Sequence, residues 1–399
     1  MKILRILNRL NIGGPTYNAG YLTKHLAPEF ETMLAAGNLD EGEAESEYIV
    51  TGMGVTPRYI KNMHRAIRPW SDWQGYREIK ALIREFKPDI VHTHSSKAGA
   101  LGRLAASHMG VRAIIHTFHG HPFHSYFGPL KTRFFLEVER YLANKSHAIV
   151  AISPTQKREL AETYRLCPTE KIVVVPNGFD LSRFASEREK RRTEFRRALS
   201  LPDGDAAIGI IGRFAPIKNH SLFLKAFSKI KREGVKAKAV LIGGGPEKDA
   251  CIQTAKGLGL NVVAVDYEAG FDPPATHYDA IFLHWVKKVE TVLPGLDIVA
   301  LSSLNEGTPA TLIEAQASGV AVVSTRVGGV EDSVAPGFHP FLTPSGDVEA
   351  FARSLSTLVK EANVRNRLVR EGEAFVRTTF SYERLIKDMS ALYRRLLSR

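Results

Sequence analysis

The sequence LDIVALSSLNEGTPATLIEAQASG, residues Leu296–Gly319, contains a strand, a polar turn and a helix in succession. Its apolar run Ile298–Leu301 is short enough for a buried parallel strand, and an apolar helix follows the turn. Thr308 favours the N-cap, and Pro309 suits the first helical position, where a missing N–H costs nothing. A strand, a loop and a helix N-terminus leave backbone N–H groups free, which predicts an anion site suited to a phosphate or diphosphate.

Two carboxylates bracket this predicted anion site. Glu306 lies on the loop before the helix, and Glu314 lies about one and a half turns inside it. An acidic residue beside a phosphate site is unusual unless it binds neutral hydroxyls, and sugars and ribose carry many hydroxyls. The stretch therefore predicts a nucleotide-sugar site. The alternative is that both glutamates are solvated residues on a helix face.

Length and composition limit the possible classes of protein. A chain of 399 residues is long enough for two domains, each with its own core. Its two cysteines provide neither a zinc pattern nor a disulfide framework, so we expect a reducing cytoplasm. We expect no signal peptide, because glycines follow the basic apolar start too soon, and no run approaches the ~20 apolar residues of a transmembrane helix.

The net charge of +12 lies mostly in the first half of the chain. Residues 1–200 have 30 Lys+Arg against 20 Asp+Glu, whereas residues 201–399 have 24 against 22. Nucleic acid is one possible partner, but no recognition motif accompanies the charge, so we expect none. An anionic lipid surface or an anionic acceptor fits better. Residues 54–76 favour lipid because basic side chains alternate there with Trp70 and Trp73, although two core tryptophans in a solvated loop and helix are the alternative.

The first half alternates between strands and helices and has two further ligand candidates. Gly13 and Gly14 follow the predicted strand Lys2–Asn8 and precede a helix, so the backbone there can approach a ligand closely. The strand Ile114–Phe118 delivers His119 to a loop at its carboxyl end, where open α/β sheets bind ligands. The same stretch contains three further histidines, so the choice of His119 is an interpretation: His116, His121 and His124.

The second half opens with AIGIIGRFAPIKN, residues 207–219, in which a buried strand precedes Arg213 and Lys218. Two cations at the carboxyl end of a strand can stabilise a leaving diphosphate, where negative charge grows as the glycosidic bond breaks. The next strand ends in a glycine turn that begins at Gly243. His92 and His94 look like metal ligands, but no third ligand lies nearby in the sequence. Asp203–Asp205 matches a metal-type D-x-D, but it lies in the polar turn before a strand, so we expect no metal.

These motifs together resemble family 4 of the retaining glycosyltransferases, which have the GT-B fold. The resemblance rests on S-x-x-E-G-x-P-x-x-x-x-E-A at residues 303–315, GR-x4-KN at 212–219, PDIVHTH at 88–94 and VVPNGFD at 174–180. It implies an α/β fold of two doubly wound, Rossmann-like parallel-sheet domains that face a cleft. We expect an acceptor domain at residues 1–185, a donor domain at 186–379, and a last helix at about 380–399 that packs back on the first domain.

The resemblance also implies roles for individual residues in a retaining, metal-independent transfer from a nucleotide-diphosphate sugar. Arg213 and Lys218 stabilise the diphosphate, Glu306 orients the sugar, His119 contacts it near the reacting carbon and Glu314 holds the ribose. The remaining donor contacts fall on two glycine turns and on the helix start, at Gly13, Gly14, Gly243, Gly307, Thr308, Pro309 and Ala310. No cofactor is expected.

Several points stay open at this stage. Residues 264–280 depart from the family pattern and read as an inserted loop of unknown purpose. Polysaccharide or glycolipid assembly on a saccharide or lipid-linked acceptor, at the inner face of a membrane, is the function we expect. Another GT-B enzyme, such as a sugar-nucleotide epimerase or a glucan or disaccharide synthase, is an alternative, as is a catalytically silent sugar-nucleotide binding protein. A nicotinamide oxidoreductase fits the sequence less well, because the first loop has only two glycines.

Overall fold

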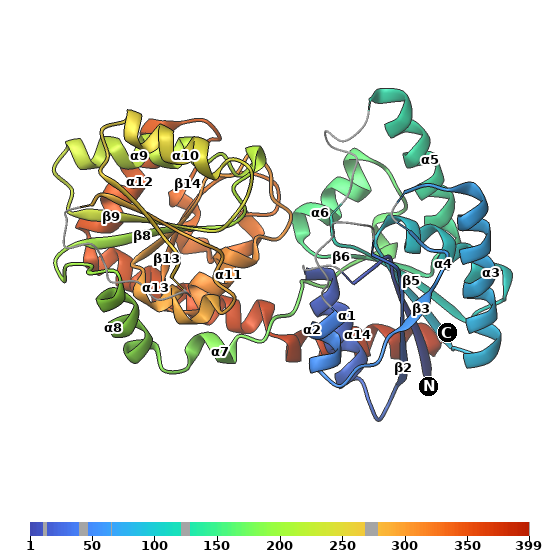
Figure 1. Ribbon diagram of the computed structural model, residues 1–399. Coiled ribbons are helices and arrows are strands. Elements are labelled where there is room, and N and C mark those ends of the chain that lie inside the picture. Colours follow the sequence, from blue (N-terminus) through green and yellow to red (C-terminus); the bar gives the residue numbers. More distant parts are fainter. Residues whose placement is uncertain (11–13, 40–46, 65, 121–127, 268–277, 399) are drawn as a thin grey trace. The chain divides into compact units, whose positions relative to one another are not determined.

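The computed structural model describes residues 1–10, 14–39, 47–64, 66–120, 128–267 and 278–398. The chain divides into two compact units (Figure 1). Unit 1 consists of Met1–Phe179 and Phe380–Arg399, and unit 2 consists of Asp180–Thr379. The sequence analysis placed the boundary between residues 185 and 186, a few residues further along the chain.

Unit 1 is a parallel sheet whose strand order, within the described residues, is β3-β2-β1-β4-β5-β6-β7. The order reverses between β1 and β4, as in doubly wound nucleotide-binding folds. The strands are β1 Lys2–Leu7, β2 Glu31–Gly37, β3 Arg58–Ile60, β4 Ile90–His94, β5 Ala113–Phe118, β6 Ala148–Ala151 and β7 Ile172–Val174. The α-helices are α1 Gly14–His25, α2 Glu47–Gly52, α3 Pro69–Phe86, α4 Ser96–His108, α5 Pro129–Lys145, α6 Pro154–Arg158 and α14 Tyr382–Leu397.

Both faces of the unit 1 sheet are covered by helices because successive side chains of a strand point to opposite faces. Ile3 packs in a core with α1 and the last helix, α14, and its neighbour Leu4 packs in a core with α3 and α4. The chain end thus completes the fold of its first half. Phe179 N–H donates to Phe380 O at 2.8 Å, which joins the two segments of unit 1.

Unit 2 repeats this architecture, with the strand order β10-β11-β9-β8-β12-β13-β14 in its described part. Its strands are β8 Ala206–Ile211, β9 Ala237–Ile242, β10 Val262–Val265, β11 Ala280–Leu283, β12 Ile298–Leu301, β13 Ala321–Thr325 and β14 Leu342–Thr343. Its α-helices are α7 Ser182–Ala185, α8 Arg188–Ala198, α9 His220–Arg232, α10 Lys248–Gly257, α11 Ala310–Ala317, α12 Val348–Lys360 and α13 Ala362–Phe380. The α/β fold of two doubly wound parallel sheets is as expected.

One local expectation differs from the structure. Pro309, with φ −72° and ψ 97°, is itself the N-cap of α11, so the helix begins one residue later than predicted and Thr308 does not cap it. Before β12 the chain forms two short 3-10 turns, Val289–Thr291 and Leu293–Gly295. Helix α8 packs beside them, and its Arg192 and Arg196 pair with Asp297 at 2.8 and 3.2 Å.

Candidate active site

In unit 2 the carboxyl ends of β8 and β12 lie side by side at the point where the strand order reverses. The loop after β8 contains Arg213 and Lys218, and the loop after β12 contains Glu306. Two hydrogen bonds join the loops: Leu304 N–H donates to Ile217 O at 2.8 Å, and Ser302 Oγ donates to Lys218 O at 3.0 Å. The topology and these bonds explain why residues so distant in sequence meet.

Lys218 and Glu306 form a close ion pair at this edge. Lys218 Nζ lies 2.6 Å from Glu306 Oε1, and the two side chains are 27% and 11% exposed. Ser303 Oγ donates to the same carboxylate oxygen at 2.5 Å. Both contacts use Oε1, so among the described residues Oε2 receives no hydrogen bond. One oxygen fixes the carboxylate, and the other can accept from a ligand hydroxyl.

The loop that carries Glu306 is held from its other side by the turn after β13. Gly329 N–H donates to Glu306 O at 3.0 Å, and Thr325 Oγ1 donates to Ser303 O at 2.6 Å. A Cβ on Gly328 or Gly329 would collide with the carbonyl oxygens of Glu306 and Gly307. Glycine is required here because the two backbone segments approach each other closely.

Arg213 differs from Lys218 because its side chain is exposed and forms neither an ion pair nor a hydrogen bond with the rest of the described chain. Gly243, in the turn after β9, packs against the loop that carries Arg213. It has φ 153°, and a Cβ there would collide with Gly212 O. Gly243 therefore allows the turn after β9 to pack on the turn after β8.

At the start of α11, Gly307 is exposed, Thr308 and Ala310 are partly exposed, and Pro309 is buried. Leu312 N–H donates to Pro309 O at 3.1 Å, whereas the N–H groups of Ala310 and Thr311 precede the first bond of the helix and have no acceptor within it. The helix dipole makes this end positive, which favours an anion. The structure thus brings the helix start and the Lys218–Glu306 pair onto one loop system.

Glu314, the fifth residue of α11, lies near a second cation, Arg183. Arg183 Nη2 is 3.9 Å from Glu314 Oε1, and its Nη1 is 3.9 Å from Glu290 Oε2. Burial raises the pKa of Glu314 to about 7; Arg183 opposes the rise and Glu290 adds to it. Because both distances are longer than a hydrogen bond, this group of three side chains is only loosely paired. Arg183 and Glu290 were not among the residues predicted from the sequence.

In unit 1 the carboxyl ends of β1, β4 and β5 present a second set of predicted residues. Gly14 is the first residue of α1, and the structure places Asn177 beside it. His119 follows β5, and its Nε2 lies 2.9 Å from His94 Nδ1. Burial lowers the pKa of His119 to about 4, and the Asn177 side chain opposes this shift. The ring is therefore neutral at pH 7.

The structure distinguishes among some of the candidate histidines. His116 is buried and its Nδ1 lies 2.9 Å from Thr93 Oγ1, so it points into the core. His121, His124 and Gly13 lie outside the described residues. Asn177, which lies beside Gly14 and interacts with His119, was not among the predicted site residues, although it lies in the family-like motif VVPNGFD.

No group of three or more His, Cys, Asp or Glu side chains in the described chain is arranged to hold a metal ion. The pair His92 and His94 contacts Arg5 instead. Asp205 lies before β8, at the opposite end of the strand from Lys218.

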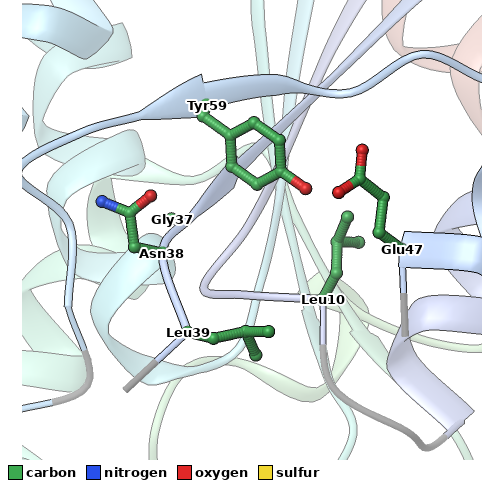
Figure 2. Close-up of a pocket in the computed structure, with 6 residues that line it drawn as sticks. All are labelled: Leu10, Gly37, Asn38, Leu39, Glu47 and Tyr59. Carbon is green, nitrogen blue, oxygen red and sulfur yellow. The ribbon is translucent and has the colours of Figure 1, made fainter. Parts of the chain in front are cut away.

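A small cavity opens at the carboxyl ends of β1 and β2 in unit 1. Its volume is about 220 Å³. Figure 2 shows the hydroxyl of Tyr59 directed toward the side of the cavity where Glu47 lies. The lining combines apolar and hydrogen-bonding groups: Leu10, Gly37, Asn38, Leu39, Glu47 and Tyr59. Such a lining suits a small polar ligand with an apolar face.

Comparison with known protein families matches both halves of the chain. The model described as Glycosyltransferase Family 4 matches residues 12–183, and the model for glycosyl transferases group 1 matches residues 205–361. A UDP-Gal:alpha-D-GlcNAc-diphosphoundecaprenol alpha-1,3-galactosyltransferase from Escherichia coli is 26% identical over 318 residues, which are 78% of each chain. A D-inositol 3-phosphate glycosyltransferase from Salinispora tropica is 28% identical over 323 residues, covering 76% of this chain and 63% of the relative.

Solved structures share the fold over nearly the whole chain. The crystal structure of Anabaena Alr3699/HepE in complex with UDP has a TM-score of 0.80 at 18% identity and covers 99% of this chain and 100% of that one. A glycosyltransferase from Rickettsia africae has a TM-score of 0.79 at 17% identity, with 99% and 98% covered. Sucrose-phosphate synthase from Thermosynechococcus elongatus has a TM-score of 0.75 at 16% identity and full coverage of both chains. The expected GT-B fold is confirmed.

Proposed function

The chain belongs to family 4 of the glycosyltransferases, and on this premise we propose that it transfers a sugar from a nucleotide-diphosphate sugar to a hydroxyl acceptor with retention of anomeric configuration. The observation that carries the proposal is the Lys218–Glu306 pair beside the start of α11. This loop system combines positive charge for a diphosphate with an acceptor for sugar hydroxyls. The HepE structures, one with UDP and one with UDP-glucose, support a donor of this class.

In the donor site, Lys218 and Arg213 neutralise the charge that grows on the diphosphate as the glycosidic bond breaks. The N–H groups at Gly307, Thr308 and Ala310 bind phosphate oxygens, and Pro309 sets the backbone at the helix start. Glu306 accepts from a hydroxyl of the transferred sugar through Oε2.

Glu314 holds the ribose hydroxyls, and Gly243 and Gly14 keep the backbone of their turns close to the donor. His119 donates to a hydroxyl of the transferred sugar. A neutral ring suits this role, because it forms the hydrogen bond without adding a full charge beside the reacting carbon.

The proposed reaction passes through an ion-pair transition state, with the acceptor attacking from the face of the leaving group. Glu306 is not assigned as a covalent nucleophile, because its free oxygen, Oε2, is proposed to accept from a sugar hydroxyl while Lys218 and Ser303 bind Oε1. Lys218, Arg213 and the helix start supply the positive charge that a divalent cation supplies in other transferases, so we propose a metal-independent reaction. Transfer is then expected to proceed unchanged in excess EDTA, and restoration of lost activity by Mg²⁺ or Mn²⁺ would refute this part.

The proposed acceptor is a saccharide or lipid-linked saccharide used in bacterial polysaccharide or glycolipid assembly. The E. coli relative, whose name includes a diphosphoundecaprenol acceptor, supports this class. The cavity in Figure 2 offers Tyr59 and Glu47 for a sugar ring and its hydroxyls. Hexose or N-acetylhexosamine is the proposed transferred sugar.

We propose that the protein works as a cytoplasmic, peripheral enzyme at an anionic membrane surface. No described helix is long and apolar enough to span a bilayer. The core alternative for the two tryptophans is wrong, because Trp70 and Trp73 are 69% and 45% exposed and stack at 4.9 Å. Helix α5 also exposes apolar side chains, with Leu130 86% and Phe134 65% exposed. Exposed aromatic and basic residues together favour the lipid interface.

Vesicle sedimentation tests the membrane proposal. The protein is expected to sediment with phosphatidylglycerol vesicles and to stay in solution with phosphatidylcholine, and the double change Trp70→Ala, Trp73→Ala is expected to weaken sedimentation. Equal behaviour of the wild type on both lipids would contradict the proposal.

A donor panel tests the function itself. UDP-, GDP- and ADP-sugars are added singly, and both the shift in melting temperature and the release of nucleoside diphosphate are measured. We expect one nucleotide class to stabilise the protein and to be turned over when an acceptor is present. Binding without turnover for every acceptor would favour a silent binding protein, and no response to any donor would contradict the donor site.

A further inference from the structure

A buried cation lies in the core of unit 1, behind His119. Arg5, on β1, is fully buried, and no carboxylate of the described chain forms an ion pair with it. Its Nη1 instead reaches His92 Nδ1 at 2.9 Å, Tyr393 OH at 3.2 Å and His94 Nε2 at 3.4 Å. Burying a charge without a counter-ion is costly, so this arrangement calls for an explanation beyond packing.

The charge of Arg5 determines where the proton of His94 lies. Nη1 of Arg5 has two hydrogens for three neighbours, and His94 Nε2, at 3.4 Å, is the most distant of them. A guanidinium cannot accept a hydrogen bond and would repel an N–H directed at it, so Nε2 of His94 presents its lone pair to the cation. Burial and the neighbouring positive charge lower the pKa of His94 far below its usual value, so the ring is neutral. A neutral ring that accepts at Nε2 has its proton on Nδ1.

His94 in turn determines which nitrogen of His119 carries the proton. His94 Nδ1 lies 2.9 Å from His119 Nε2, so His94 donates and His119 accepts at Nε2. The proton of the neutral His119 ring must then be on Nδ1. That atom is buried and lacks a well-formed hydrogen bond in the described part of the chain, and the Asn177 side chain is the neighbouring group that interacts with the ring. A buried donor without a well-formed hydrogen bond is unfavourable, and a ligand acceptor would relieve that cost.

We propose that Arg5 and His94 are positioning residues that hold His119 in the neutral Nδ1–H tautomer, so that it donates to a hydroxyl oxygen of the transferred sugar. The proposal rests on the proposed function for the sugar contact, but the tautomer follows from unit 1 alone. Tautomer control of this kind governs activity where a histidine must present one defined nitrogen.

Tyr393 of α14 also contacts Nη1 of Arg5. Its hydroxyl accepts from Arg5 Nη1 and lies 2.7 Å from His92 Nδ1, and His92 Nε2 lies 2.7 Å from Thr117 Oγ1. These contacts hold Nη1 of the guanidinium, whereas its Nε and Nη2 have no hydrogen-bond partner in the described chain. The last helix of the chain therefore helps to hold Arg5 against His94.

Nitrogen-15 NMR of the unliganded protein, labelled at histidine, tests the tautomer directly. We expect His119 to show a protonated Nδ1 and an unprotonated Nε2 at pH 7, assigned by loss of its signals in His119→Asn. A proton on Nε2 of His119 would overturn the proposal. Because the experiment needs no sugar, a correct tautomer in a protein that transfers nothing would contradict the proposed function and leave the tautomer assignment standing.

Two substitutions of His94 provide a matched pair for the kinetic test. His94→Asn places an amide N–H near the position of Nδ1, and His94→Gln places its amide near Nε2. We expect His94→Gln to lower kcat by roughly 10- to 100-fold, as loss of a supporting hydrogen bond does elsewhere, with the affinity for nucleoside diphosphate unchanged. His94→Asn should recover most of that loss. Equal kcat for the two variants, at equal melting temperature, would overturn the proposal.

Arg5→Lys and Arg5→Met give an independent pair if either His94 variant does not fold. Lysine keeps a cationic donor near His94 Nε2, and methionine removes it. We expect the His119 tautomer to persist in Arg5→Lys and to become mixed in Arg5→Met. If either variant fails to fold, the tautomer measured in the wild type decides the question.

Discussion

The two units share one architecture, but the candidate site of unit 2 is charged and that of unit 1 is neutral. In both, the important side chains lie at the carboxyl ends of parallel strands around the position where the strand order reverses. Unit 2 places opposite charges there, Lys218 against Glu306, at a partly exposed edge. Unit 1 places neutral histidines there, with pKa values lowered by burial. We propose that the charged site binds the diphosphate, with Glu306 accepting from a sugar hydroxyl, and that the neutral His119 donates to a sugar hydroxyl.

The largest expected effect comes from Glu306 in the charged site. Glu306→Gln keeps the size of the side chain and its contact with Lys218 but removes the negative charge. We expect kcat to fall by about 10³-fold, the upper range for loss of one electrostatic contact at a reacting centre. Initial rates with saturating donor measure the effect. Turnover equal to that of the wild type would remove Glu306 from the proposed role.

Lys218→Met should have the next largest effect. It removes a cation from the diphosphate site and leaves the carboxylate of Glu306 without its partner. We expect about a 10²-fold loss of kcat and a weaker affinity for nucleoside diphosphate, measured by calorimetry. Lys225→Met is the control, because Lys225 lies on the exposed face of α9. A similar loss in both variants would contradict a specific role for Lys218.

Glu314 predicts a stability that depends on pH in unit 2. Its folded pKa of about 7 lies above the usual 4.5, so the stability from the protonated form is fully present below about 4.5 and is lost as pH rises through 7. Glu314→Gln removes this dependence. We expect the variant to gain roughly 1–3 kcal/mol relative to the wild type between pH 5 and pH 8 in urea unfolding, and to bind nucleotide less tightly. A pH-independent difference would show that the carboxyl is not shifted.

His119 predicts the opposite trend in unit 1, with the smallest expected effect. Its folded pKa of about 4 lies below the usual 6.5, so the unfolded chain binds the proton more readily and stability falls as pH drops from about 6.5 to 4. His119→Asn should therefore be less acid-sensitive than the wild type by about 2 kcal/mol at pH 5. Parallel unfolding curves for the two proteins between pH 7 and pH 5 would contradict this.

The strand, loop and helix of residues 296–319 were predictable because each has a local signal. Ile298–Leu301 forms β12 as expected. The start of α11 was off by one residue, since cap preferences do not reveal the backbone angles that make Pro309 the cap. The loops of Lys218 and Glu306 could be predicted to meet only through the motifs, because their pairing depends on strand order.

Long-range partners could not be read from the sequence. The first segment of unit 1 ends at Phe179, which forms a hydrogen bond with Phe380, two hundred residues away in the chain. Arg5 looked like an ordinary charge in a strand, yet its partners come from β4 and α14. Among the histidines, the sequence favoured His119 by resemblance, and only the geometry shows that His116 faces the core.

The division of work between the two units is tested most directly by measuring nucleoside diphosphate binding and sugar transfer on the same three proteins: wild type, Lys218→Met and His119→Asn. The account predicts that wild type and His119→Asn bind the diphosphate alike, that Lys218→Met binds it much more weakly, and that only the wild type transfers sugar at full rate. Loss of diphosphate binding in His119→Asn together with normal binding in Lys218→Met would contradict it.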